Sequence, residues 1–171
     1  MPVMKPSLCI ATVICLFATF STAYAQTTPE QLKPFENLIG GIWKAEGRWG
    51  NGQPFKSEKQ FHWGPGRRIV RVATKGFTDQ AATVYGERNQ GIRILTAEGS
   101  LLMYEFDVFG GITKGEISTD GANIYYDYDY GGTMIRDAWQ FIDQNTYRYI
   151  VGVWKEGRWE AKYLETEFRR E

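Results

Sequence analysis

The stretch GGIWKAEGRWGNGQPFKSEKQFHW, residues 40–63, decides the fold. After the glycine pair, apolar or small residues at positions 43, 45, 47 and 49 alternate with charged residues at 44, 46 and 48, which is the period of a strand with one buried face. Asn51-Gly52 then provides a tight turn, and Phe55 to Trp63 forms the next alternating run. The sequence therefore predicts a β-hairpin over residues 43–63.

A short amphipathic helix is expected just before this hairpin. From Pro29 to Leu38 the apolar residues recur at spacings of three and four, and Gly40-Gly41 follows them. Such spacing places the apolar side chains on one helix face, and glycine is a common helix stop. The chain should therefore pass from one short helix directly into the first strand.

The two-residue period continues to the C-terminus, and no second helical segment interrupts it. The later strand-like runs, rich in Val, Ile, Tyr, Phe and Trp, are Arg67–Lys75, Thr83–Asn89, Ile92–Thr96, Leu101–Val108, Ile112–Ser118, Asn123–Tyr130, Met134–Asp143, Tyr147–Trp154 and Arg158–Phe168. Turn signals separate them, among them Gln90-Gly91, Gly110-Gly111 and Gly131-Gly132.

Strands joined by tight turns form either a two-sheet sandwich or a closed barrel. A sandwich usually needs some longer Greek-key connections, and no linker after Trp43 is long enough to suggest one. We therefore predict an all-β fold, an antiparallel up-and-down β-barrel of about ten strands with one short N-terminal helix.

The first 25 residues are typical of an export signal. Lys5 is their only charge, Ser7 to Phe20 is almost entirely apolar, and Ala23-Tyr24-Ala25 supplies the small residues that a signal peptidase requires. The apolar stretch is too short to span a bilayer comfortably. We expect a signal peptide over residues 1–25 and a secreted or periplasmic protein, without stable membrane insertion after cleavage.

Charge, cysteine and histidine content exclude several functions. The 171 residues carry 20 basic and 20 acidic side chains, so no broad basic field is available for nucleic acid or anionic membranes. Cys9 and Cys15 both lie in the signal, which leaves the mature chain without a thiol. His62 is the only histidine, and alternation places it outside the barrel. We expect no metal and no cofactor.

The segment FENLIGGIW, residues 35–43, resembles the start of a calycin barrel, where a short helical turn precedes Gly-x-Trp, here Gly41-Ile42-Trp43. The chain is similar to secreted bacterial lipocalin-like proteins of unknown function, and distantly to fatty-acid-binding proteins and nitrobindins. This resemblance implies a lipocalin-like barrel over residues 26–171, with Trp43 packed across its floor and an interior suited to a small apolar molecule. Gly41 and Trp43 are the structural residues that it implies.

Two departures limit the resemblance. Asn51-Gly52 joins the first two strands tightly and leaves no helical lid between them. No histidine lies near the C-terminus, unlike in nitrobindins, so haem ligation is not implied.

Several charged residues share the parity of apolar neighbours and would enter the lumen if those strand faces point inward. Lys59, Asp137 and Glu165 alternate in step with aromatic side chains, Trp139 being the neighbour of Asp137. Arg71 alternates in step with branched or small apolar ones. A charge inside a barrel must pair or bind something polar, because an isolated buried charge is strongly unfavourable. Lys59 or Arg71 would receive the anionic end of a ligand; the alternative is an ion pair at the rim or a bulge that turns the residue outward.

Tyr126, Tyr128 and Tyr130 lie on one parity of their strand, opposite Asp127 and Asp129. Tyrosines that face a cavity stack on flat ligands and donate hydrogen bonds to them. Ordinary packing with the hydroxyls at a rim is the alternative.

Three functions stay open at this point. The leading one is a binding protein whose lumen takes a small hydrophobic or amphipathic molecule. Its candidate ligand-binding residues are Lys59, Arg71, Tyr126, Tyr128, Asp137 and Trp139. The second is a cofactor-free enzyme of decarboxylase or isomerase type that uses Tyr, Arg, Lys and carboxylate groups, and a buried carboxylate or lysine facing a tyrosine pair would favour it. The third is a filled barrel that acts through its surface.

The mature protein should begin at Gln26, because the Ala23-Tyr24-Ala25 site directly follows the apolar run. N-terminal sequencing of exported protein should find this residue, partly cyclised. Recovery of chains that retain Met1 in a membrane fraction would contradict export.

Overall fold

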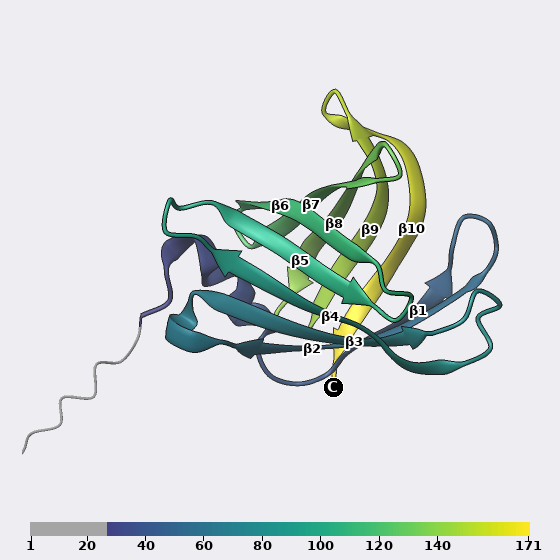
Figure 1. Ribbon diagram of the computed structural model, residues 1–171, viewed down its shortest axis with the longest axis horizontal. Coiled ribbons are helices and arrows are strands. Elements are labelled where there is room, and N and C mark those ends of the chain that lie inside the picture. Colours follow the sequence, from purple (N-terminus) through teal and green to yellow (C-terminus); the bar gives the residue numbers. More distant parts are fainter. Residues whose placement is uncertain (1–26) are drawn as a thin grey trace, which may run out of the picture.

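Ten antiparallel strands follow one another around a closed barrel (Figure 1). The computed structural model describes residues 27–171, so the predicted signal peptide, Gln26 and both cysteines lie outside the described residues. The strands are β1 Trp43–Arg48, β2 Pro54–Trp63, β3 Ile69–Phe77, β4 Tyr85–Leu95, β5 Leu101–Asp107, β6 Ile112–Asp120, β7 Asn123–Tyr130, β8 Thr133–Asp143, β9 Thr146–Lys155 and β10 Arg158–Arg170. The barrel closes where β1 pairs with β10, and the predicted up-and-down topology is confirmed.

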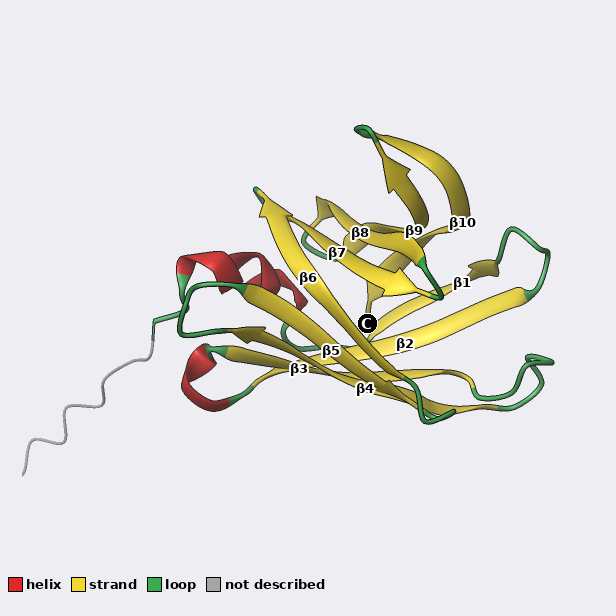
Figure 2. Ribbon diagram, turned by 45° about the horizontal axis from the view of Figure 1, so that its top comes forward, coloured by secondary structure: helices red, strands yellow, loops and turns green. Residues whose placement is uncertain are grey.

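One short helix precedes the barrel, as the apolar spacing predicts. This 3₁₀ helix, η1, covers Glu30–Leu38 and lies at the barrel end where β1 begins (Figure 2). A single further turn of helix, η2 Pro65–Arg67, links β2 to β3. Within residues 27–171 no helix is long and apolar enough to cross a membrane.

Gly41 lets the chain turn from η1 into β1. Its φ is +72°, a left-handed conformation that glycine adopts without strain. A Cβ at this position would lie 2.9 Å from Cγ of Arg170 and 3.0 Å from the carbonyl oxygen of Glu171. The structural role predicted for Gly41 follows from both constraints.

Trp43 closes the barrel end next to η1, which we call the lower end. Its side chain is fully buried, and its Nε1 donates a hydrogen bond of 2.9 Å to the carbonyl oxygen of Leu38, which ties η1 to β1. The Tyr147 ring packs against it at a centroid distance of 5.0 Å, and the Arg170 guanidinium lies 4.6 Å from its ring centroid. Trp43 is therefore buried at the barrel end next to η1.

A stack of aromatic rings fills the lumen above Trp43. Tyr147 stacks between Phe168 and Trp139, with centroid distances of 5.0 and 5.3 Å and interplanar angles of 9° and 8°. Phe61 adds an edge-on contact with Trp139 at 5.4 Å. These rings are almost completely buried, so the lower half of the barrel is a packed core.

One predicted turn lies inside a strand instead. Gln90-Gly91 belongs to β4, so the two runs predicted at 83–89 and 92–96 form one strand. A Cβ on Gly91 would lie 2.6 Å from a guanidinium nitrogen of Arg93 and 3.2 Å from Cγ of Glu105. Gly91 therefore makes room for charged side chains inside the barrel, which is another use of glycine in a strand.

Glu165 lies on the outer face of β10. Two register shifts interrupt the pairing of β10 with β9 between Trp159 and Leu164. Beyond them Leu164 and Phe168 are the buried residues, so Glu165, which follows Leu164 directly, points outward. Glu165 is exposed and forms an ion pair of 2.7 Å with Lys162, so the prediction that it faces inward is wrong.

Replacing Trp43 with Ala should lower the free energy of unfolding by about 3 to 5 kcal/mol, because the change empties a fully buried site and removes the bond to η1. Urea unfolding followed by circular dichroism measures this loss. Tyr130→Ala is the control, since Tyr130 is 72% exposed and its loss should cost no more than about 0.5 kcal/mol. An unchanged midpoint for Trp43→Ala would show that the floor does not depend on this residue.

Candidate functional site: a cavity above the aromatic core

The upper half of the barrel encloses a cavity of about 970 Å³. Its rim includes Asn51, Gln80 and Phe109, which lie in the β1–β2, β3–β4 and β5–β6 connections, at the barrel end opposite η1 (Figure 1). Small-molecule sites usually measure roughly 300 to 1,000 Å³. The lumen is therefore open above and filled below, and its upper half has the size of a ligand site.

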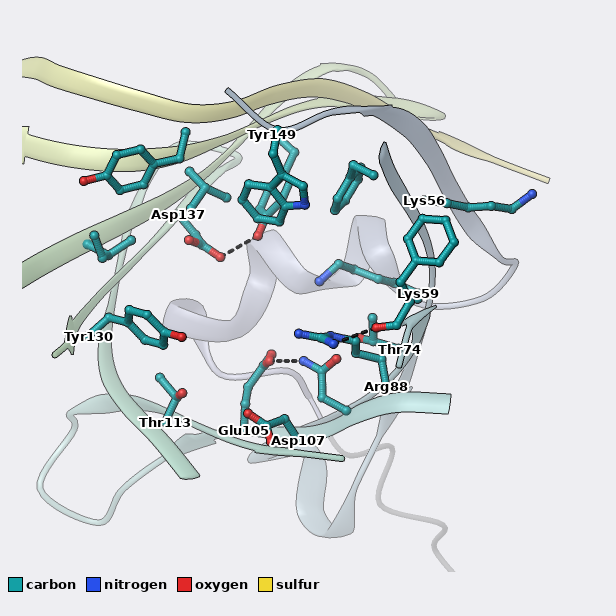
Figure 3. Close-up of a pocket in the computed structure, with 18 of the residues that line it drawn as sticks. Lys56, Lys59, Thr74, Arg88, Glu105, Asp107, Thr113, Tyr130, Asp137 and Tyr149 are labelled. Atoms are coloured by element: carbon teal, nitrogen blue, oxygen red, sulfur yellow. Dashed lines mark hydrogen bonds between the residues drawn. The ribbon is translucent and has the colours of Figure 1, made fainter. Parts of the chain in front are cut away.

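Eight charged side chains line this cavity, and we call the four that burial affects most the polar belt: Lys59 of β2, Arg93 of β4, Glu105 of β5 and Asp137 of β8. Lys59, Glu105 and Asp137 point into the cavity from different sides (Figure 3). The belt comprises one ion pair, one carboxyl hydrogen-bonded to two tyrosines and one amine surrounded by aromatic rings.

Arg93 and Glu105 form the ion pair. The guanidinium Nη2 lies 2.5 Å from Oε1 of Glu105, and Asn89 donates a hydrogen bond of 2.5 Å to the other carboxylate oxygen. Burial raises the pKa of Glu105, but the nearby charges of Arg93 and Lys59 outweigh this effect and hold it below its usual range. Because Arg93 is 1% exposed and stays charged, the pair is neutral as a whole.

Asp137 accepts hydrogen bonds from two tyrosines. The Tyr149 hydroxyl donates to Oδ2 at 2.6 Å, and the Tyr128 hydroxyl donates to Oδ1 at 3.0 Å. Burial raises the pKa of Asp137 to about 6, although the Tyr149 hydrogen bond and the charge of Lys59 act in the opposite direction. This carboxyl therefore changes protonation state close to neutral pH.

Aromatic rings surround the Lys59 amine, and no carboxylate among residues 27–171 forms an ion pair with it. Its Nζ lies 5.3 Å from the ring centroid of Trp139, 5.5 Å from that of Tyr149 and 5.9 Å from that of Phe168. The side chain is 7% exposed, and Nζ makes no hydrogen bond or ion pair with any residue from 27 to 171. Burial lowers the pKa of Lys59. Its N–H donors are thus available to a molecule in the cavity.

The structure brings together all but one of the predicted binding residues. The cavity is lined by Lys59, Tyr126, Tyr128, Asp137 and Trp139. The expectation that Lys59 or Arg71 projects inward is thus met by Lys59.

Arg71 is exposed on the outside of β3, opposite His62 of β2, so the prediction of an inward Arg71 is wrong. Ile69 and Ala73, whose parity suggested it, also lie on the outer face, where apolar side chains are common. The outward position of His62 is confirmed.

Sequence reasoning missed Arg93, Glu105 and Tyr149. Arg93 was missed because Gln90-Gly91 was interpreted as a turn, so the strand that contains Arg93 was predicted as two shorter strands. Glu105 follows the inward-facing Met103 by two residues, so the parity test applied to Lys59 would have found it. Among residues 27–171, no group of three or more His, Cys, Asp or Glu side chains lies close enough to hold a metal ion.

In comparisons with known proteins, no protein-family model matches the sequence, and no curated protein matches it at a significant level. The solved structure of Rv2717c from M. tuberculosis matches with a TM-score of 0.52 and 14% identity, over 85% of this chain and 99% of that chain. At this identity the likeness shows the barrel fold alone.

Two other solved structures are more distant. The S-type phycobiliprotein lyase CPES from Guillardia theta has a TM-score of 0.47 and 11% identity, with 80% of this chain and 90% of that chain covered. A de novo designed fluorescence-activating β-barrel has a TM-score of 0.43 and 10% identity, with 81% of this chain and 98% of that chain covered.

The raised pKa of Asp137 predicts a distinct dependence of stability on pH. The folded chain holds this proton up to about pH 6, whereas the unfolded chain releases it near 3.8, so wild-type stability falls as the pH rises between these values. The Asp137→Asn variant has no carboxyl at this position, so its stability should not fall for this reason. Relative to the variant, the wild type should lose about 3 kcal/mol between pH 3.5 and pH 7, because one pKa unit corresponds to about 1.4 kcal/mol.

Urea unfolding of both proteins across this pH range measures the difference. Asp120→Asn removes an exposed carboxylate and should keep the wild-type profile. Parallel profiles for the wild type and Asp137→Asn would contradict the raised pKa.

Proposed function

We propose that this protein binds a small hydrophobic or amphipathic molecule in its barrel lumen. The observation that carries the proposal is the buried amine of Lys59, which has no ion-pair partner among residues 27–171 and lies on an aromatic floor below an open cavity. Further up, the lining mixes apolar side chains such as Trp49 and Phe55 with polar ones such as Arg88 and Asp107. Apolar surfaces combined with polar groups that fix orientation are typical of ligand sites.

The arrangement favours a ligand that enters with its polar end first. Arg93 is already neutralised by Glu105, so Lys59 is the belt cation without an ion-pair partner. A buried ammonium without a partner is costly, and a carboxylate bound to it would relieve that cost. We therefore propose a carboxylate or similar anionic group at Lys59, with the apolar part of the ligand toward the mouth.

We also propose that the protein acts after export. The support is the signal pattern of residues 1–25, together with the resemblance of FENLIGGIW to the first turn and strand of calycin barrels. On this proposal, residues 26–171 form a secreted or periplasmic lipocalin-like domain.

A cofactor-free enzyme of decarboxylase or isomerase type is the second candidate. It is favoured by Asp137, whose carboxyl has a pKa of about 6 and is positioned by Tyr128 and Tyr149 at the cavity wall. A general acid or base works best when its pKa lies near the operating pH. Asp137 would then exchange a proton with an acid bound at Lys59.

Decanoic acid should bind about tenfold or more tightly than methyl decanoate or decanol, because one charge-assisted hydrogen bond contributes more than a kilocalorie per mole. Isothermal titration calorimetry measures all three affinities. Lys59→Met should abolish the preference, whereas Arg71→Gln, which removes an exposed cation from the neighbouring strand, should keep it.

Equal affinities for acid and ester in the wild type would disprove the anion anchor, and no binding of any of the three would disprove a lumen site for chains of this kind. Circular dichroism of Lys59→Met separates lost binding from lost folding. Chromatography of the recovered ligand tests the enzyme candidate, since a product in place of a bound acid would support it.

A further inference from the structure

Lys59 has the surroundings of a nucleophilic amine. It is the one buried lysine among residues 27–171, and its Nζ ends in the cavity (Figure 3). Other lysines of this part of the chain point to solvent, and several are held in ion pairs, such as Lys56 with Glu46 at 2.8 Å. The rings of Trp139, Tyr149 and Phe168 surround the Lys59 amine, and no residue from 27 to 171 forms an ion pair with it.

We propose that Lys59 forms a reversible covalent imine with ligands that carry an aldehyde or ketone group. The inference rests on the proposed lumen site and adds a second class of ligand to it. The same amine accepts a carboxylate when protonated and attacks a carbonyl carbon when unprotonated, so the two classes compete for one position.

The chemistry needs no further reactant. The nitrogen lone pair attacks the carbonyl carbon, a C–N bond forms, and the carbonyl oxygen takes up a proton while the nitrogen loses one. The resulting carbinolamine then breaks its C–O bond and releases water, which leaves a C=N bond to Lys59. Amine and carbonyl thus give imine and water, and hydrolysis reverses the reaction.

Desolvation makes the neutral amine accessible. Burial disfavours the ammonium form, and the charge of Arg93 acts in the same direction, whereas Glu105 and Asp137 favour the ammonium. Burial has the largest effect, so the pKa of Lys59 lies below that of a surface lysine. A lysine desolvated in an apolar site is one of the recognised forms of an activated nucleophile.

Asp137 is placed to serve the dehydration step. The Tyr149 ring packs against the amine of Lys59 at 5.5 Å, and its hydroxyl donates to Asp137 at 2.6 Å, so one side chain contacts both groups. In its protonated form the Asp137 carboxyl supplies a proton to the departing hydroxyl, and as a carboxylate it balances the charge of a protonated imine. Asp137 lines the same cavity as Lys59.

The experiment treats the wild-type protein with one equivalent of decanal in the presence of sodium cyanoborohydride, which reduces an imine to a stable secondary amine. Peptide mass spectrometry then locates the alkyl group. At neutral pH, Lys59 should carry about tenfold more label than exposed Lys75 on the neighbouring strand, because its amine is both less protonated and next to the bound aldehyde. Excess decanoic acid should suppress labelling of Lys59 and leave Lys75 unchanged.

Two variants complete the test. Lys59→Arg keeps the positive charge but forms no imine under these conditions, and it should lose the selective label. Lys75→Arg is the matched surface control and should keep it. Label spread evenly over the surface lysines, or the same total label in Lys59→Arg, would overturn the proposal, and the wild-type peptide map decides even if Lys59→Arg folds poorly.

Calorimetry with decanoic acid separates this inference from the proposed function. Tight binding of the acid without selective labelling of Lys59 by decanal overturns the imine alone. Absence of both overturns the lumen site itself and the imine with it.

Discussion

Closure of the lower barrel end by Trp43 is the interaction on which the rest of the structure depends. The indole fills the floor, bonds to η1 through the Leu38 carbonyl and supports the stacked rings of Tyr147, Phe168 and Trp139. Because these buried rings fill the lumen next to Trp43, the polar belt lies above them. The aromatic core therefore fixes the depth of the cavity as well as the stability of the fold.

Burial inside the barrel determines the pairing and protonation of each charged side chain of the polar belt. Arg93 and Glu105 neutralise each other, and Asp137 is held by two tyrosine hydroxyls while its pKa rises toward neutrality. Lys59 has only aromatic faces, which attract a cation but leave its N–H donors unsatisfied. Lys59 therefore favours a ligand group that accepts its hydrogen bonds, and that preference is the basis of the ligand chemistry proposed above.

Alternation and turn residues were enough to predict the barrel, the helix before it and the inward positions of Lys59 and Asp137, because β2 and this part of β8 keep one register throughout. The failures have local causes. The position of Arg71 was predicted wrongly because its neighbours Ile69 and Ala73 are apolar although they lie on the outer face. Gly91 was interpreted as a turn residue, whereas in the structure it makes room for Arg93. Which charged side chains pair across strands depends on the register between the strands. The residue pattern of one strand gives no information about that register.

The closed floor also constrains how one occupant replaces another. Since the end near Trp43 is sealed by buried side chains, a molecule in the lumen enters and leaves through the same mouth. A second molecule cannot push the first one onward, so the lumen must empty before it refills. The rate of ligand exchange is then set by the dissociation rate of the bound molecule. A higher concentration of a competitor changes which molecule occupies the barrel at equilibrium but does not change that dissociation rate.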